Sequence, residues 1–101
     1  MFTTLPDRDT AGALGRSLVA DRLAACVSVG APMDSIYHWR GAIETSTEIP
    51  LAIKTRADLF AAVAAAIRAR HPYELPEIVA VPISDGATDY LAWIDAGTRA
   101  S

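Results

Sequence analysis

Hydrophobic positions recur along this chain with two different spacings. Apolar residues three to four positions apart predict two amphipathic helices, one over residues 9–24 and one running to about Arg70. Strict alternation of apolar and polar side chains predicts a half-buried strand from Ile49 to Ile53. Shorter apolar runs predict further strands at residues 2–5, 25–29, 33–39 and 77–83, and a last helix from Thr88 to Gly97.

Polar residues and prolines mark where these elements begin and end. Asp7 or Asp9 is expected to accept hydrogen bonds from the free N–H groups of the first helix. Residues 55–58 resemble a capping box for the second helix, and Thr88 is expected to cap the last. Pro32 cannot donate to a strand ladder, so a bulge or bend is expected there.

The element order predicts the fold class. Strand, helix, strand, strand, helix, strand is the split βαβ or ferredoxin-like arrangement, an α+β antiparallel sheet with two helices on one face, here with an extra C-terminal helix. The hairpin around Gly41 has arms of about 13 residues, on the order of 40 Å, whereas a 100-residue domain has a radius of gyration of about 13 Å. The hairpin is therefore expected to project and to pair with a neighbouring chain.

Composition narrows the class of protein. A length of 101 residues predicts one domain over residues 1–101, and 51% hydrophobic residues are ample for a packed core. A net charge of -3 does not favour nucleic acid or an anionic membrane as a partner. No secretory signal and no apolar run of about 20 residues is visible, and a single cysteine suits a reducing compartment. The expectation is a soluble cytoplasmic protein.

Residues 71–78 (HPYELPEI) form the first candidate site. Two prolines make this segment stiff, and it carries one of only two histidines together with an aromatic ring and two carboxylates. Stiff loops with titratable groups often carry function. The segment is equally suited to be a rigid joint between helix and strand.

Two further features allow a functional and a structural interpretation. On residues 33–39, Tyr37 and Trp39 share one face of the predicted strand, as the wall of a ligand site or as a subunit contact. Cys26 is either a small buried hydrophobe or a copper ligand, because thiolate and imidazole suit copper. No pair of His and Cys has metal-ligand spacing, so a site would need residues distant in sequence or from two subunits.

Lys54 and Glu77 are charged residues at the ends of two predicted strands. They are interpreted either as a partly buried ion pair or as a site for an anionic or zwitterionic ligand. The chain shows no nucleophile–base–orienter triad and no glycine-rich phosphate loop, so neither an enzyme nor an organic cofactor is expected.

Four stretches together resemble the CutA divalent-cation tolerance family. They are residues 23–27 (LAACV), 35–41 (SIYHWRG), 71–77 (HPYELPE) and 89–93 (DYLAW), and residues 4–7 and 53–55 also fit. The resemblance implies a ferredoxin-like subunit of a cytoplasmic homotrimer linked to the response to copper and other divalent metal ions. By matching positions it implies Cys26 and His71 as metal ligands. It also implies an intersubunit ligand cleft lined by Tyr37, Trp39, Lys54, Tyr73, Glu77 and Trp93.

Three hypotheses follow from the resemblance and the residues together. The first is a divalent-metal tolerance trimer that binds copper or another divalent metal weakly. The second is a trimer similar in architecture to the P-II signalling proteins, with a small metabolite in the subunit clefts. The third is a stable scaffold in which the aromatic and charged residues form only subunit contacts.

Overall fold

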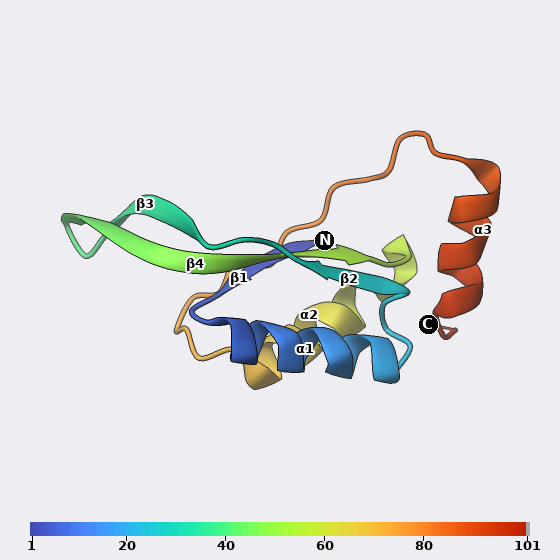
Figure 1. Ribbon diagram of the computed structural model, residues 1–101, viewed down its shortest axis with the longest axis horizontal. Helices are drawn as coiled ribbons and strands as arrows, with labels where there is room; N and C mark the ends of the chain where they lie inside the picture. The colour runs from blue at the N-terminus through green and yellow to red at the C-terminus, as the bar shows by residue number, and fades with distance from the viewer. Residues whose placement is uncertain (101) are drawn as a thin grey trace.

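A long central strand organises the computed structural model, which describes residues 1–100 (Figure 1). Residues 1–100 form four strands, three α-helices and a short 3-10 helix. In order these are β1 (Phe2–Leu5), α1 (Arg8–Ala20), β2 (Cys26–Val29), β3 (Met33–Trp39), β4 (Ala42–Lys54), η1 (Ala57–Leu59), α2 (Phe60–Arg70) and α3 (Thr88–Gly97).

Strand β4 pairs antiparallel with all three other strands. β1 lies along one edge, with Phe2 opposite Ala52, and β2 lies along the other, with Cys26 opposite Lys54. β3 continues from β2 and follows β4 to the turn at 40–41. The expected hairpin is thereby confirmed.

The bend expected at Pro32 is present as an extra residue between β2 and β3. Val29 lies opposite Leu51 and Met33 lies opposite Glu48, so four steps along one edge match three along the other. The Gly30 N–H still reaches the Pro50 carbonyl at 2.8 Å. Proline falls where the ladder loses its regular pairing, which is the position that tolerates its missing N–H.

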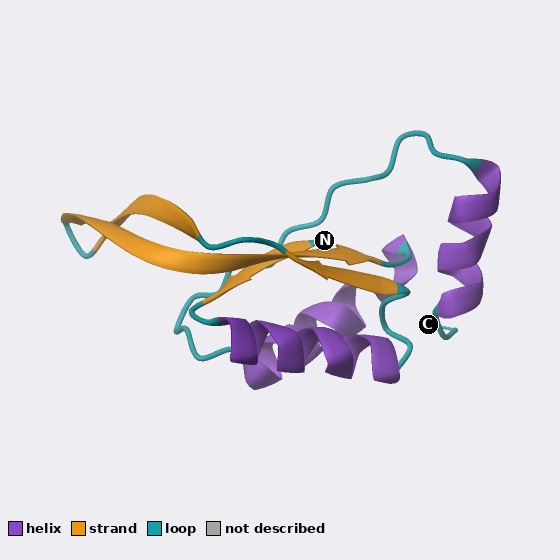
Figure 2. Cartoon of the chain, viewed as in Figure 1, coloured by secondary structure: helices purple, strands orange, loops and turns teal. Residues whose placement is uncertain are grey.

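Helices α1 and α2 cover one face of the sheet, and α3 lies at the end opposite the hairpin (Figure 2). Their apolar stripes meet Leu51 and its same-face neighbours on β4. The core contains Leu5, Ala11, Leu14, Leu18, Leu23, Ala24, Ile49, Leu51, Ile53, Leu59, Val63 and Ile67. The fold is the predicted ferredoxin-like α+β sandwich, and its other sheet face is left open.

One predicted strand is absent. Residues 77–83 form no strand and pair with β1 only through Phe2 and Val79, whose N–H and C=O groups exchange hydrogen bonds of 2.9 and 3.3 Å. Continuing this register would place Glu77 opposite Thr4. The Thr4 carbonyl, however, already accepts a hydrogen bond from the ring of His71 instead of pairing with residue 77. Because β1 begins at Phe2, the residues after Val79 have no β1 residue opposite them.

Three expected details at helix ends are wrong. α1 ends at Ala20 rather than residue 24, because Arg22 takes a left-handed φ of 57° that breaks the helix. The Thr55 hydroxyl donates to the Leu23 carbonyl at 2.6 Å instead of capping the second helix. Thr88 lies inside α3, whose N-cap is Ala87.

Asp7 does cap α1, as expected. Its carboxylate accepts from the Thr10 N–H at 2.7 Å and from the Thr10 hydroxyl at 3.1 Å. These hydrogen bonds, the backbone one first, lower the pKa of Asp7.

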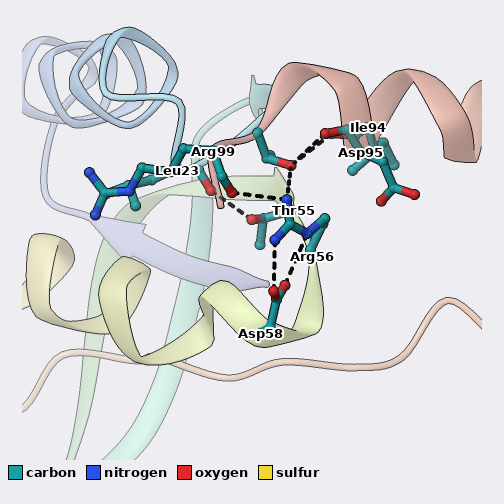
Figure 3. Close-up of polar contacts among 8 residues, drawn as sticks. Leu23, Thr55, Arg56, Asp58, Ile94, Asp95 and Arg99 are labelled. Carbon is teal, nitrogen blue, oxygen red and sulfur yellow. Dashed lines mark hydrogen bonds and ion pairs between the residues drawn. The ribbon is translucent and has the colours of Figure 1, made fainter. Parts of the chain in front are cut away.

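The end of α3 is held to the sheet by Arg56 (Figure 3). Its guanidinium donates to both carboxylate oxygens of Asp58 at 3.0 and 2.7 Å, to the Arg99 carbonyl at 2.9 Å and to the Thr98 hydroxyl at 3.3 Å. On the neighbouring turn, Arg22 Nη2 donates to the Ala96 carbonyl at 2.6 Å. Planar guanidinium groups suit such multiple contacts, and here they fix a helix that makes few core contacts.

The β3–β4 hairpin projects beyond the helices, giving dimensions of 45 × 26 × 22 Å (Figure 1). Ile36 and Ile43 on this hairpin are 72% and 70% exposed. The overhang predicted from its length is therefore present in the single chain. Across residues 1–100, none of the helices has the length and apolar character needed to span a bilayer.

Candidate functional site

A pocket of about 620 Å³ lies where the projecting hairpin meets the loop after α2. β3 and β4 supply one wall and the proline-stiffened segment 72–77 supplies the other. We call it the hairpin pocket. Its lining residues are Thr4, Ser35, Ile36, Tyr37, His38, Trp39, Ser46, Glu48, Pro72, Tyr73, Glu74, Leu75 and Glu77.

Glu48 is the buried charged residue of this pocket. Ile49, Leu51 and Ile53 point to the helices, so alternation turns Glu48 to the open face of the sheet. The Thr4 hydroxyl donates to its Oε2 at 3.0 Å. Buried carboxylates need such partners, and Thr4 supplies one from the neighbouring strand.

The Tyr73 phenol lies beside this carboxylate. Burial, then the hydrogen bond and the negative charge of Glu48, raise the pKa of Tyr73 to about 12. On the hairpin, the Tyr37 hydroxyl is 2.7 Å from the Ser46 hydroxyl. Two phenols and one carboxylate thus converge from the two strands of the hairpin and from the loop after α2.

His71 shapes the loop from outside the pocket. Its Nδ1 accepts from the Tyr73 N–H at 3.1 Å, so the proton of the neutral ring is on Nε2, which donates to the Thr4 carbonyl at 2.7 Å. The centres of the His71 and Tyr73 rings are 4.8 Å apart. Both nitrogens of His71 are therefore engaged with backbone groups, and the ring fixes the position of Tyr73.

Cys26 is a free, partly exposed thiol on the open face of the sheet. It lies opposite Lys54, and its Sγ is 4.0 Å from the Ser28 hydroxyl, which also accepts from Lys54 Nζ at 3.0 Å. His71 contacts β1 on the other side of β4, level with Pro50. Within one chain the two expected metal ligands are thus on opposite sides of the central strand.

Four of the six expected cleft residues come together. Tyr37, Trp39, Tyr73 and Glu77 all line the hairpin pocket. Lys54 instead lines a second, largely apolar groove with residues 80–83. Trp93 lies on α3 and stacks on Tyr90 at 5.6 Å.

Lys54 and Glu77 do not pair with each other within residues 1–100, where the ion pairs join Arg40 to Glu74 and Arg56 to Asp58.

Glu48 and Thr4 were missed by the sequence reasoning. The alternation was followed only from Ile49 to Ile53, whereas β4 also includes the polar residues 44–48. Continuing the alternation backward from Lys54 through Ala52 and Pro50 would have placed Glu48 on the same face. Nothing in the sequence indicated that Thr4 is its partner, because the pairing of these two residues depends on the register between β1 and β4.

No cluster of three or more His, Cys, Asp or Glu side chains suited to a metal ion is present within residues 1–100. A metal held by Cys26 would therefore need ligands from another chain or from solvent.

The fold and the open sheet face define a class of small ferredoxin-like proteins with a projecting β-hairpin. The chain matches the family described as CutA1 divalent ion tolerance protein over residues 1–97, and it belongs to that family.

Curated relatives agree over the whole chain. The chloroplastic protein CutA 1 of Oryza sativa is 37% identical over 101 residues, which are 100% of this chain and 57% of the relative. The divalent-cation tolerance protein CutA of Thermus thermophilus is 39% identical over 97% of this chain and 95% of the relative. The chain thus spans little more than half of the plant relative and nearly all of the bacterial one.

Solved structures show the same fold. CutA1 from Oryza sativa superimposes with a TM-score of 0.96 at 37% identity, covering 99% of this chain and 92% of that one. CutA from Xylella fastidiosa gives 0.94 at 45% identity, covering 97% and 94% of the two chains.

Proposed function

We propose that this protein acts in divalent-cation tolerance and binds copper or another divalent metal ion weakly, as part of the response to metal ions. The observation that carries the proposal is the family match over residues 1–97. The family and two bacterial relatives are named for tolerance rather than for a reaction, which supports a non-catalytic role.

Cys26 is the ligand that this proposal places first. It is a soft donor, it is not in a disulfide, and it lies partly exposed on the open sheet face. His71 is the second proposed ligand. It joins the metal through Nδ1 only after that nitrogen releases the Tyr73 N–H, which weakens binding, while Nε2 keeps its hydrogen bond to the Thr4 carbonyl.

The proposed assembly is a homotrimer. Its support is the exposed apolar surface of the single chain, on the hairpin at Ile36 and Ile43 and on the unpaired segment at Val81 and Ile83. Extended edges with free backbone groups suit pairing with a second copy. Light scattering would then give three times the mass of the 10.7 kDa chain.

The proposed location is the cytoplasm, supported by the single unpaired cysteine. The proposal includes no organic cofactor and no nucleic-acid or membrane partner, in line with the net charge of -3. Fractionation of the source cells checks the location.

Calorimetric titration with Cu(II), and with Cu(I) in the absence of oxygen, tests the metal ligands. Cys26→Ser should weaken copper binding by about tenfold or more, since it removes the thiolate. Ser28→Ala is the matched control, because it changes the neighbour of the thiol and leaves the thiol itself. Copper affinity unchanged in both Cys26→Ser and His71→Gln would remove these two residues from the site.

The alternative of a P-II-like signalling trimer with an anionic or zwitterionic metabolite stays a prediction. The separation of Lys54 from Glu77 in the single chain gives it no added support.

A further inference from the structure

The hairpin pocket combines aromatic walls with negative charge. No lysine or arginine occurs among its described lining residues. The lining includes the rings of three residues, Tyr37, Trp39 and Tyr73, the imidazole of His38, and three carboxylates, those of Glu48, Glu74 and Glu77. Aromatic faces and carboxylates together attract cations and disfavour anions.

Glu48 is the buried carboxylate among the three that line the pocket. The residue is only 8% exposed, yet it lines the pocket, so its carboxylate acts where water screens little. One oxygen accepts from the Thr4 hydroxyl at 3.0 Å, which holds the group in place. A ligand cation reaching Glu48 would form a charge-assisted hydrogen bond in a partly desolvated setting.

The rim of the pocket already binds a cation of the chain itself. The Arg40 guanidinium lies 5.4 Å from the centre of the Trp39 ring, and its Nη2 donates to Glu74 Oε2 at 2.9 Å. One ring and one carboxylate thus hold a guanidinium at the exposed edge. Elsewhere in the pocket, the Tyr73 phenol is hydrogen-bonded to the Glu48 carboxylate, so an aromatic residue and a carboxylate again line the pocket together.

We propose that the hairpin pocket binds a small organic cation with a guanidinium or primary ammonium group, whose charged end lies at Glu48 and whose stem lies between the aromatic walls. The pocket volume of about 620 Å³ suits a small metabolite. Neither Cys26 nor His71 lines the pocket, so this organic ligand is separate from the proposed copper ligands.

Calorimetric titration of the full chain with agmatine tests the proposal, since agmatine carries a guanidinium and an ammonium on a short stem. 1,4-Butanediol and succinate are the neutral and anionic probes of similar length. Binding of agmatine alone, weakened by added salt, is the expected result. Equal binding of all three probes, or no binding of agmatine because a second copy fills the pocket, would overturn the proposal.

Glu48→Gln keeps the shape of the side chain and removes its charge, and should weaken agmatine binding by about tenfold or more. Glu44→Gln is the matched control, because Glu44 is an exposed carboxylate of the same strand that does not line the pocket.

If Glu48→Gln does not fold, Trp39→Leu at the exposed hairpin tip provides the same test through the aromatic wall. Agmatine affinity unchanged in the folded variants contradicts the proposal. Copper titration of the same variants keeps the two proposals apart, because a pocket variant should leave copper binding intact.

Discussion

The Thr4 hydroxyl donates a hydrogen bond of 3.0 Å to Glu48 Oε2, joining β1 to β4 on the open face of the sheet. The adjacent residue, Thr3, points to the opposite face and is 1% exposed. Its hydroxyl is buried and has no hydrogen-bond partner within the described chain. Two neighbouring threonines therefore have opposite effects on stability.

Thr3→Val should raise the free energy of unfolding by about 1 kcal/mol, because it removes a buried hydroxyl that lacks a partner. Thr4→Val should lower it by about 1–3 kcal/mol, because it removes one hydrogen-bond donor of the buried Glu48 carboxylate. Urea unfolding at one fixed protein concentration measures both changes. A loss of stability in Thr3→Val would contradict this account.

Tyr73 should make stability depend on pH in the alkaline range. Its pKa in the folded protein is raised to about 12, above its usual value of 10.0. Between these values the unfolded chain loses the phenolic proton and the folded chain keeps it. The contribution of Tyr73 is thus fully present below pH 10.0 and is lost as the pH rises through about 12.

Melting temperatures measured across this range should fall less steeply for Tyr73→Phe than for the unmodified protein. Tyr90→Phe on the exposed face of α3 is the control and should leave the slope unchanged. Tyrosine ionisation can also be followed by ultraviolet absorbance. The phenol that ionises at about 12 should be missing from Tyr73→Phe and present in Tyr90→Phe.

Leu18→Ala should destabilise the protein by about 2–5 kcal/mol, since it opens a cavity among fully buried side chains. Val19→Ala, one residue on, removes methyl groups from an exposed position and should change the free energy of unfolding by less than about 0.5 kcal/mol. Denaturant unfolding of the pair measures the contrast. Similar losses in the free energy of unfolding for the two variants would show that α1 packs against the core through a different face.

Arg56→Gln should loosen the end of α3, because it removes a guanidinium that contacts Asp58, Thr98 and the Arg99 carbonyl. Hydrogen exchange of the amides in α3 should become faster, while amides in β4 keep their protection. Arg68→Gln removes the same charge from the exposed surface of α2 and serves as the control. Unchanged exchange in α3 would mean that other contacts hold this helix.

Much of the fold was predictable because its signals are local. Alternating residues around Leu51 and the helical spacing of Leu14 and Leu18 define faces that must be buried together, whatever their partners. The hairpin overhang followed from strand length alone. Boundaries were less predictable, since the end of α1 depends on the left-handed conformation of Arg22, a residue with no glycine-like signal.

The candidate site was predictable only in part. Tyr37, Trp39, Tyr73 and Glu77 were expected in a cleft between subunits, which stays a prediction, and within the single chain they line the hairpin pocket. Lys54 and Trp93 were expected with them but lie elsewhere in the single chain. Cys26 and His71 stay predicted metal ligands that the single chain holds apart.

The sequence by itself determined the α+β class, the order of elements as far as α2 and the projecting hairpin, because hydrophobic periodicity and strand length act within one segment. Only the tertiary structure decided that Thr4 bonds to Glu48 and that the Thr4 carbonyl binds the ring of His71. Only it showed that residues 77–83 pair through Val79 alone. Those contacts depend on register between segments distant in sequence, and a shift of one residue would turn each side chain to the other face of the sheet.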